Sequence, residues 1–77
     1  MKKTIDAELG GRRFHFQQEA FEALERYMYA IEQALGDDDE AVEVMADIEG
    51  RIAELLVERL GEGREVVGDA DVAFIIE

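Results

Sequence analysis

Two glycines near the start of the chain constrain its fold more than any other feature. Gly10 and Gly11 separate two short segments, residues 4–9 and 12–17, in which apolar and polar side chains alternate. Alternation with a period of two is typical of strands with one buried face. A Gly-Gly pair suits a type I′ turn, because both central residues of that turn need a positive φ. We therefore predict a β-hairpin over residues 4–17.

A two-residue loop also fixes which residues face each other across this hairpin. Leu9 then pairs with Arg12, and on the other face the polar residues pair acid with base, Glu8 with Arg13. A shift of one residue would set the phenylalanines against acids, so the turn and the side-chain pattern specify the same register. The apolar face predicted by this register consists of Ile5, Ala7, Phe14 and Phe16, and the polar face includes the pair Asp6 and His15.

The middle of the chain has the period of amphipathic helices. Apolar residues recur at spacings of three and four, which predicts one helix over about 19–35 and a second over about 38–60. Gly36 can end the first helix, and the acidic run 37–40 supplies a cap and favourable charge to the second. Because the connection is short, we expect an antiparallel helical hairpin. The predicted inward stripes are Phe21, Leu24, Met28, Ile31 and Leu35 in the first helix, and Val42, Met45, Ile48, Ile52, Leu55, Leu56 and Leu60 in the second.

Gly50 interrupts the second helix, where glycine costs about 1 kcal/mol relative to alanine, so we expect it to mark a close crossing of the first helix. Residues 69–76 are expected to form a short C-terminal helix, with Val72, Ile75 and Ile76 facing inward. The chain, residues 1–77, is thus predicted to be a single small α+β domain. We expect a two-stranded antiparallel β-hairpin packed on an antiparallel helical hairpin, with the short C-terminal helix added.

The charged composition argues against a nucleic-acid partner. The chain has 20 acidic and 8 basic residues, for a net charge of −12. Affinity for nucleic acids depends mostly on contacts of Lys and Arg with phosphates. We also expect no membrane span in this chain, because no segment approaches the roughly 20 apolar residues that a spanning helix needs.

The residue types present leave little chemistry for an active site. The chain has no cysteine, no serine and one histidine, His15, which rules out a Ser/His/Asp or Cys/His constellation and a multi-histidine metal site. The acidic run from Asp37 does not fit an EF-hand loop, because Val42 and Ile48 stand where glycine and glutamate are needed. We expect no enzymatic activity, no catalytic residues, no cofactor and no metal.

Several side chains are candidates for contact with a partner. Arg12 and Arg13, at the hairpin tip, are either solvated or meet an anionic surface. Tyrosine is common both at interfaces and at core edges, so the tyrosines of the first helix remain open to either reading. Arg51 either forms a surface ion pair with Asp47, one turn earlier, or reaches a partner. The full candidate set is Arg12, Arg13, Tyr27, Tyr29 and Arg51.

Four parts of the chain resemble a known bacterial family. They are the opening segment, residues 2–15; Ala20–Phe21 with Leu24 and Tyr27; the run ADIEGRIAELL, residues 46–56; and the pair Val66–Val67, followed by Asp71–Val72. Together they resemble the N-terminal segment that precedes the PspC domain in phage-shock-protein-C-like proteins. Gln17 and Gly50 depart from that pattern, which has aspartate and alanine there.

The resemblance also implies a cellular location and a biological context. Such segments are cytoplasmic accessory domains at the inner face of the bacterial inner membrane, in proteins associated with envelope stress and often labelled stress-responsive regulators. On this basis we expect the natural protein to continue beyond Glu77 into a membrane tether.

Two functions remain open from the sequence. The first is a non-enzymatic protein-interaction or oligomerisation module, which binds a protein partner or a second copy of itself as a homodimer through a free strand edge or a helix face. The second is a DNA-binding, stress-responsive transcriptional regulator. The first is favoured, because recognition helices carry Lys and Arg and neither predicted helix has a basic face.

Overall fold

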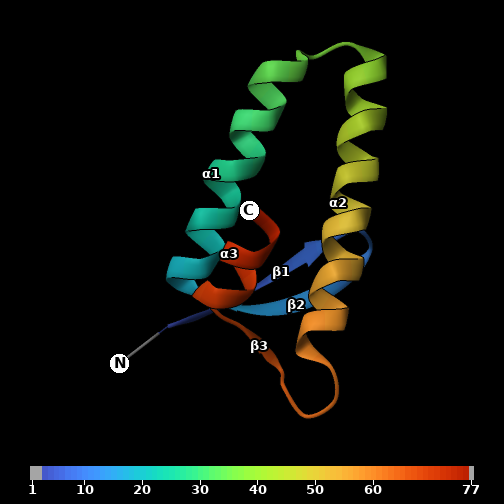
Figure 1. The fold of residues 1–77 in the computed structure, drawn as a ribbon. Coiled ribbons are helices and arrows are strands. Elements are labelled where there is room, and N and C mark those ends of the chain that lie inside the picture. Colours follow the sequence, from blue (N-terminus) through green and yellow to red (C-terminus); the bar gives the residue numbers. More distant parts are fainter. Residues whose placement is uncertain (1–2, 77) are drawn as a thin grey trace.

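A computed structural model describes residues 3–76 and has an α+β fold with a mixed sheet (Figure 1). Two long antiparallel helices, α1 and α2, run side by side, with the sheet behind their lower halves and α3 in front (Figure 1). The elements in chain order are β1 (Thr4–Leu9), β2 (Arg12–Gln17), α1 (Gln18–Leu35), α2 (Asp39–Leu60), β3 (Val66–Val67) and α3 (Asp69–Ile76).

The predicted register of β1 and β2 is confirmed. Leu9 pairs with Arg12, and every pair outward from the turn is the expected one. Gly10 and Gly11 have φ values of 58° and 81°, the positive values that a type I′ turn requires. On the polar face, the Asp6 carboxylate is bonded to His15 Nδ1.

The sheet has a third strand, so the prediction of a two-stranded sheet is wrong. β3 pairs with β2 in parallel, with Val66 opposite His15 and Val67 opposite Phe16. β2 is therefore the central strand, and within the described chain β1 pairs with β2 alone. The two valines favour a brief extended segment, but two residues have no measurable alternation, so the sequence does not indicate that they pair with β2.

The core lies where the sheet, both long helices and α3 meet. Phe16 is its centre: its ring is 6.0 Å from that of Phe14 and 5.4 Å from that of Phe21, measured between centroids. Burying such aromatic rings provides a large part of the stability of a small domain. The buried cluster consists of Leu9, Phe14, Phe16, Ala20, Leu24, Ile52, Ala53, Leu56, Val67 and Val72.

Gly50 does not mark a crossing of the two helices, contrary to the prediction. The close approach involves the β-turn instead: a Cβ at Gly10 would lie 3.0 Å from Gly50 Cα and 3.0 Å from Ala53 Cβ. A Cβ on Gly50 itself would meet nothing within 4 Å. The turn therefore rests on α2, and Gly10 is the glycine that this contact needs.

Replacing Gly50 with alanine should therefore raise the free energy of unfolding. We expect a gain of about 0.5–1 kcal/mol, because alanine loses less backbone entropy in a helix and has room here. Urea denaturation followed by circular dichroism measures it, with Ala46→Gly at an exposed position of α2 as the reverse control. A loss of stability in Gly50→Ala would contradict the open space found around this residue.

The far half of the helical hairpin extends beyond the sheet and α3, which makes the domain elongated, 39 × 23 × 22 Å. Two helices alone bury only the faces that meet each other, so several predicted core residues are exposed here. Val42 is 63% exposed and Leu35 37% exposed, while Met28 and Ile31 are only partly buried. Ile76, at the end of α3, was also predicted to face inward but is 40% exposed.

Candidate interaction surfaces

The sequence candidates do not form one site. Arg12 and Arg13 are exposed at the start of β2, beside the turn. Tyr27 is half-buried against the core, whereas Tyr29 is 62% exposed. Within residues 3–76 no group of three or more His, Cys, Asp or Glu side chains could hold a metal ion. None of the helices in that range is long and apolar enough to cross a bilayer.

The predicted ion pair of Arg51 with Asp47 is wrong. Arg51 Nη1 instead lies 3.2 Å from Glu54 Oε2, one turn further along α2. Both side chains are mostly exposed, and such a pair contributes little to stability, typically about 0.2–1 kcal/mol. The Arg51 side chain therefore stays at the surface, within reach of a partner.

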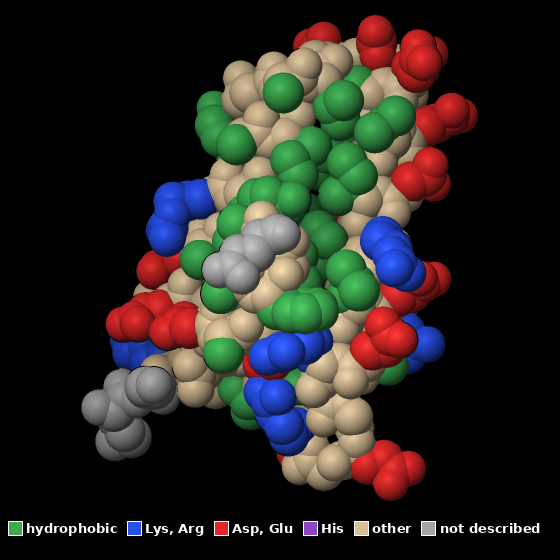
Figure 2. Space-filling view, viewed as in Figure 1, with side chains coloured by type: hydrophobic (Ala, Val, Ile, Leu, Met, Phe, Trp, Pro, Cys, Tyr) green, Lys and Arg blue, Asp and Glu red, His purple; other side chains and the backbone are tan. Residues whose placement is uncertain are grey.

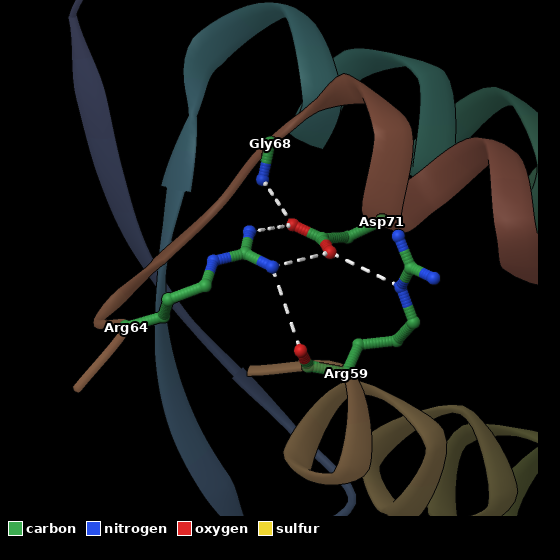
Figure 3. A network of polar contacts seen from close by, with 4 residues as sticks. All are labelled: Arg59, Arg64, Gly68 and Asp71. Carbon is green, nitrogen blue, oxygen red and sulfur yellow. Dashed lines mark hydrogen bonds and ion pairs between the residues drawn. The ribbon is translucent and has the colours of Figure 1, made fainter. Parts of the chain in front are cut away.

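The most concentrated polar cluster was not found from the sequence. Asp71 is only 1% exposed, yet it binds two arginines (Figure 3). Arg64 donates two hydrogen bonds to the Asp71 carboxylate, from Nη1 to Oδ1 at 3.2 Å and from Nη2 to Oδ2 at 2.5 Å. Arg59 donates from Nε to Oδ1 at 3.2 Å, and the backbone N–H of Gly68 donates to Oδ2 at 2.9 Å.

This cluster begins α3 and ties it to α2. The Gly68 carbonyl accepts bonds from the N–H groups of Asp71 and Val72, and the Asp71 side chain returns a bond to the Gly68 N–H, as the acid of a capping box does. Burial alone would raise the pKa of Asp71, but the bonds from Arg64, Gly68 and Arg59 outweigh it and hold the pKa below its ordinary value. Arg59 also lies over the Phe74 ring, 4.7 Å from its centroid.

An apolar surface covers the α3 side of the molecule, where α3 leaves the far half of the hairpin open. Figure 2 shows hydrophobic side chains gathered between α1 and α2 beyond α3. Helical spacing places Val44, Ile48 and Arg59 on one stripe of α2. Arg59 contacts Asp71 and Phe74 of α3, so this stripe lies on the α3 side of the molecule. We call this surface the α3-side face. Helical spacing assigns to it Tyr27 and Ile31 of α1 with Val44 and Ile48 of α2, and Phe74 of α3 lies beside Arg59.

A second apolar surface lies on the opposite side of the same two helices, beside β1. Two hollows of about 540 Å³ each adjoin there, and Glu32 and Glu49 line both of them. We call the two together the sheet-side groove. Its apolar side chains include Phe21, Leu24, Met28, Tyr29, Val42 and Met45, and its acidic side chains are Glu8, Glu25, Glu32, Asp37 and Glu49.

The charges are strongly separated along the hairpin. Residues 32–49, which form its far half, contain eight acids and no base. Basic side chains border the α3-side face at its other end, where Arg59 and Arg64 bind Asp71 (Figure 2). Each face is thus apolar in the middle, and the two differ in the charges along their edges.

Known proteins supply no further guide to these surfaces. The chain matches no family model, and neither a curated protein nor a solved structure is significantly similar to it. A functional interpretation therefore depends on the physical chemistry of the two faces.

Proposed function

We propose that this chain is a non-enzymatic oligomerisation module whose α3-side face binds a second copy of itself. The observation that carries the proposal is the group of hydrophobic side chains exposed between α1 and α2 beyond α3 (Figure 2). On this face Val44 is 36% exposed and Phe74 is 52% exposed, which is a large exposure for apolar side chains. Contiguous apolar patches on a monomer's surface commonly mark protein-interaction sites.

The charge layout favours a second copy over another protein as the occupant. In a symmetric dimer the same surface serves both subunits. A two-fold axis through the middle of the face would bring the acidic tip, Asp37–Glu40, of one copy towards the other end of its partner, where Arg59 and Arg64 lie. Charge separation along the face thus becomes complementary when the copy is reversed, which reduces the repulsion between two chains of net charge −12.

The arginines are poorly placed for the alternative of DNA binding. Arg59 and Arg64 are bound to Asp71, and the net charge of these three side chains is only +1, too little to hold a phosphate backbone. The far half of the hairpin would repel phosphates, because residues 32–49 carry only acids among their charged side chains. The interaction module is therefore the function that we propose.

The PspC-like resemblance adds a setting to this proposal. In that setting the module is a cytoplasmic accessory domain at the inner face of the bacterial inner membrane, in an envelope-stress protein. Self-association there would bring two copies of the membrane-tethered protein together.

Val44→Lys tests the dimer directly. Light scattering after size exclusion should give twice the 8.7 kDa chain mass for the wild type. We expect Val44→Lys to weaken the dimer by about tenfold or more, because it places a charge in the apolar face, a loss of at least about 1.4 kcal/mol.

Val42→Lys is the matched control for this experiment. It makes the same substitution two residues earlier on α2, in the sheet-side groove, and should leave the dimer unchanged. A wild-type chain that stays monomeric up to about 1 mM would overturn the proposal. Equal weakening by the two variants would also overturn it, because the dimer would then not depend on the α3-side face.

A further inference from the structure

We infer that the sheet-side groove is a separate docking site, which binds a short amphipathic helix with Lys or Arg residues beside its apolar stripe. The groove lies on the opposite side of α1 and α2 from the α3-side face. Its occupant is therefore independent of the proposed dimer, and the two sites can be tested separately.

The shape of the groove fits a helix. It starts at β1, where Ala7, Glu8 and Leu9 line it, and continues between α1 and α2 to Gly36. From Leu24 to Gly36, α1 alone gives it a length of about 18 Å, at 1.5 Å per residue. This is the length of about three helical turns, and laying an apolar helix face into such a groove is a common mode of peptide recognition.

The lining of the groove is suited to apolar side chains. Leu24 and Met45 are buried in its floor and Met28 is partly buried. Tyr29 and Val42, on opposite helices, are more than 60% exposed, at 62% and 63%. A helix in the groove would cover both, and methionine adapts its shape to different partners.

The charges along the groove select the kind of helix. Among the described residues that line it, five are acidic and one, Arg26, is basic. An acidic helix would be repelled, and so would the far hairpin half of a second copy, which carries acids and no bases. Lysines or arginines on both sides of an apolar stripe would instead meet Glu25 and Glu32 on one wall and Glu49 on the other.

The experiment uses a fluorescein-labelled peptide of leucine and lysine, about 14 residues long, with leucines at helical spacing. A second peptide has glutamate in place of every lysine. Fluorescence anisotropy at physiological salt measures binding to the whole chain, and circular dichroism measures the helix gained by the peptide. We expect saturable binding of the lysine peptide, with gain of helix, and at least about tenfold weaker binding of the glutamate peptide.

Two variants decide where the peptide binds. Val42→Lys should weaken it at least about tenfold, because it removes an apolar contact and adds a repelling charge. Val44→Lys makes the same change of charge on the opposite side of α2 and should alter the affinity less than about twofold. It should still disrupt the dimer, so failure of one proposal is distinguishable from failure of the other.

Three results would overturn the inference. The first is the absence of saturable binding up to about 1 mM peptide. The second is equal weakening by Val42→Lys and Val44→Lys, which would show general attraction between a basic peptide and an acidic protein. The third is binding without gain of helix, which would point to an extended segment along the edge of β1 that pairs with no strand among residues 3–76.

Discussion

Replacing Asp71 with asparagine should lower the free energy of unfolding by about 2–3 kcal/mol at neutral pH. Asparagine has nearly the same size, but it loses the charge that Arg59 and Arg64 bind. The loss should not reach the upper end for a broken buried pair, because these arginine side chains are 33% and 50% exposed and water replaces part of the interaction. Urea denaturation followed by circular dichroism measures the change.

The loss caused by Asp71→Asn should depend on pH. The pKa of Asp71 in the folded chain is below its ordinary value of 3.8, so the folded state favours the ionised form. Its stabilising contribution is fully present above the unfolded pKa, and it is lost as the pH falls through the folded value. The difference between wild type and variant should therefore be constant from pH 7 to about pH 5 and shrink below about pH 4.

Asp69→Asn provides the matched control for this prediction. Asp69 is also in the first turn of α3, but it is exposed, so its removal should cost only about 0.3–1 kcal/mol through the helix dipole. If Asp71→Asn were no more damaging than Asp69→Asn, the arginine bonds of Asp71 would contribute nothing to stability. A difference that persisted unchanged to pH 2 would contradict the pKa direction.

The β1–β2 register could be predicted because its signals are local. Gly10 and Gly11 specify the turn, and the alternation of the next few residues on each side specifies which face is buried. The cap of α2 is another local signal: Asp38 Oδ1 accepts a bond from the Ala41 N–H at 2.8 Å. Such features depend on residues close together in the chain, and the sequence contains all of them.

The third strand and the Asp71 cluster could not be predicted, because they depend on distant parts of the chain meeting. Val66 and Val67 become a strand only because β2 lies beside them. Asp71 stands three residues after Gly68, but glycine has no side chain that would mark a capping box in the sequence. The burial of Asp71 between Arg59 and Arg64 could not be predicted either, because nothing local distinguishes it from the other acidic residues, which number 20 with it.

The two candidate surfaces show a different limit of sequence reasoning. The stripe that includes Val42 has the helical period of a core, but the period does not say which turns have a partner. Val42 is exposed because the sheet covers only the other end of the hairpin. Val44 is exposed because α3, on the opposite side, also covers only that end. The candidate tyrosines likewise separate, with Tyr29 lining the groove and Tyr27 on the α3-side face.

Replacing Gly10 with alanine should destabilise the domain by about 3 kcal/mol, because two effects add. Its φ of 58° is strained for a residue with a Cβ. In addition, that Cβ would lie 3.0 Å from Gly50 Cα and 3.1 Å from the Glu49 carbonyl oxygen, both backbone atoms of α2 that cannot easily move. The hairpin would have to shift away from the helix, which would disturb the packing of Leu9 beside it.

Gly11→Ala separates the two effects. Gly11 has a φ of 81°, but a Cβ there meets nothing within 4 Å, so its replacement should cost only the backbone strain, about 1 kcal/mol. Thermal and urea unfolding of both variants measure the difference, which is the packing cost of the turn against α2. Equal losses would mean that the turn does not need to rest on α2, and that the apolar face of the hairpin alone holds the sheet on the helices.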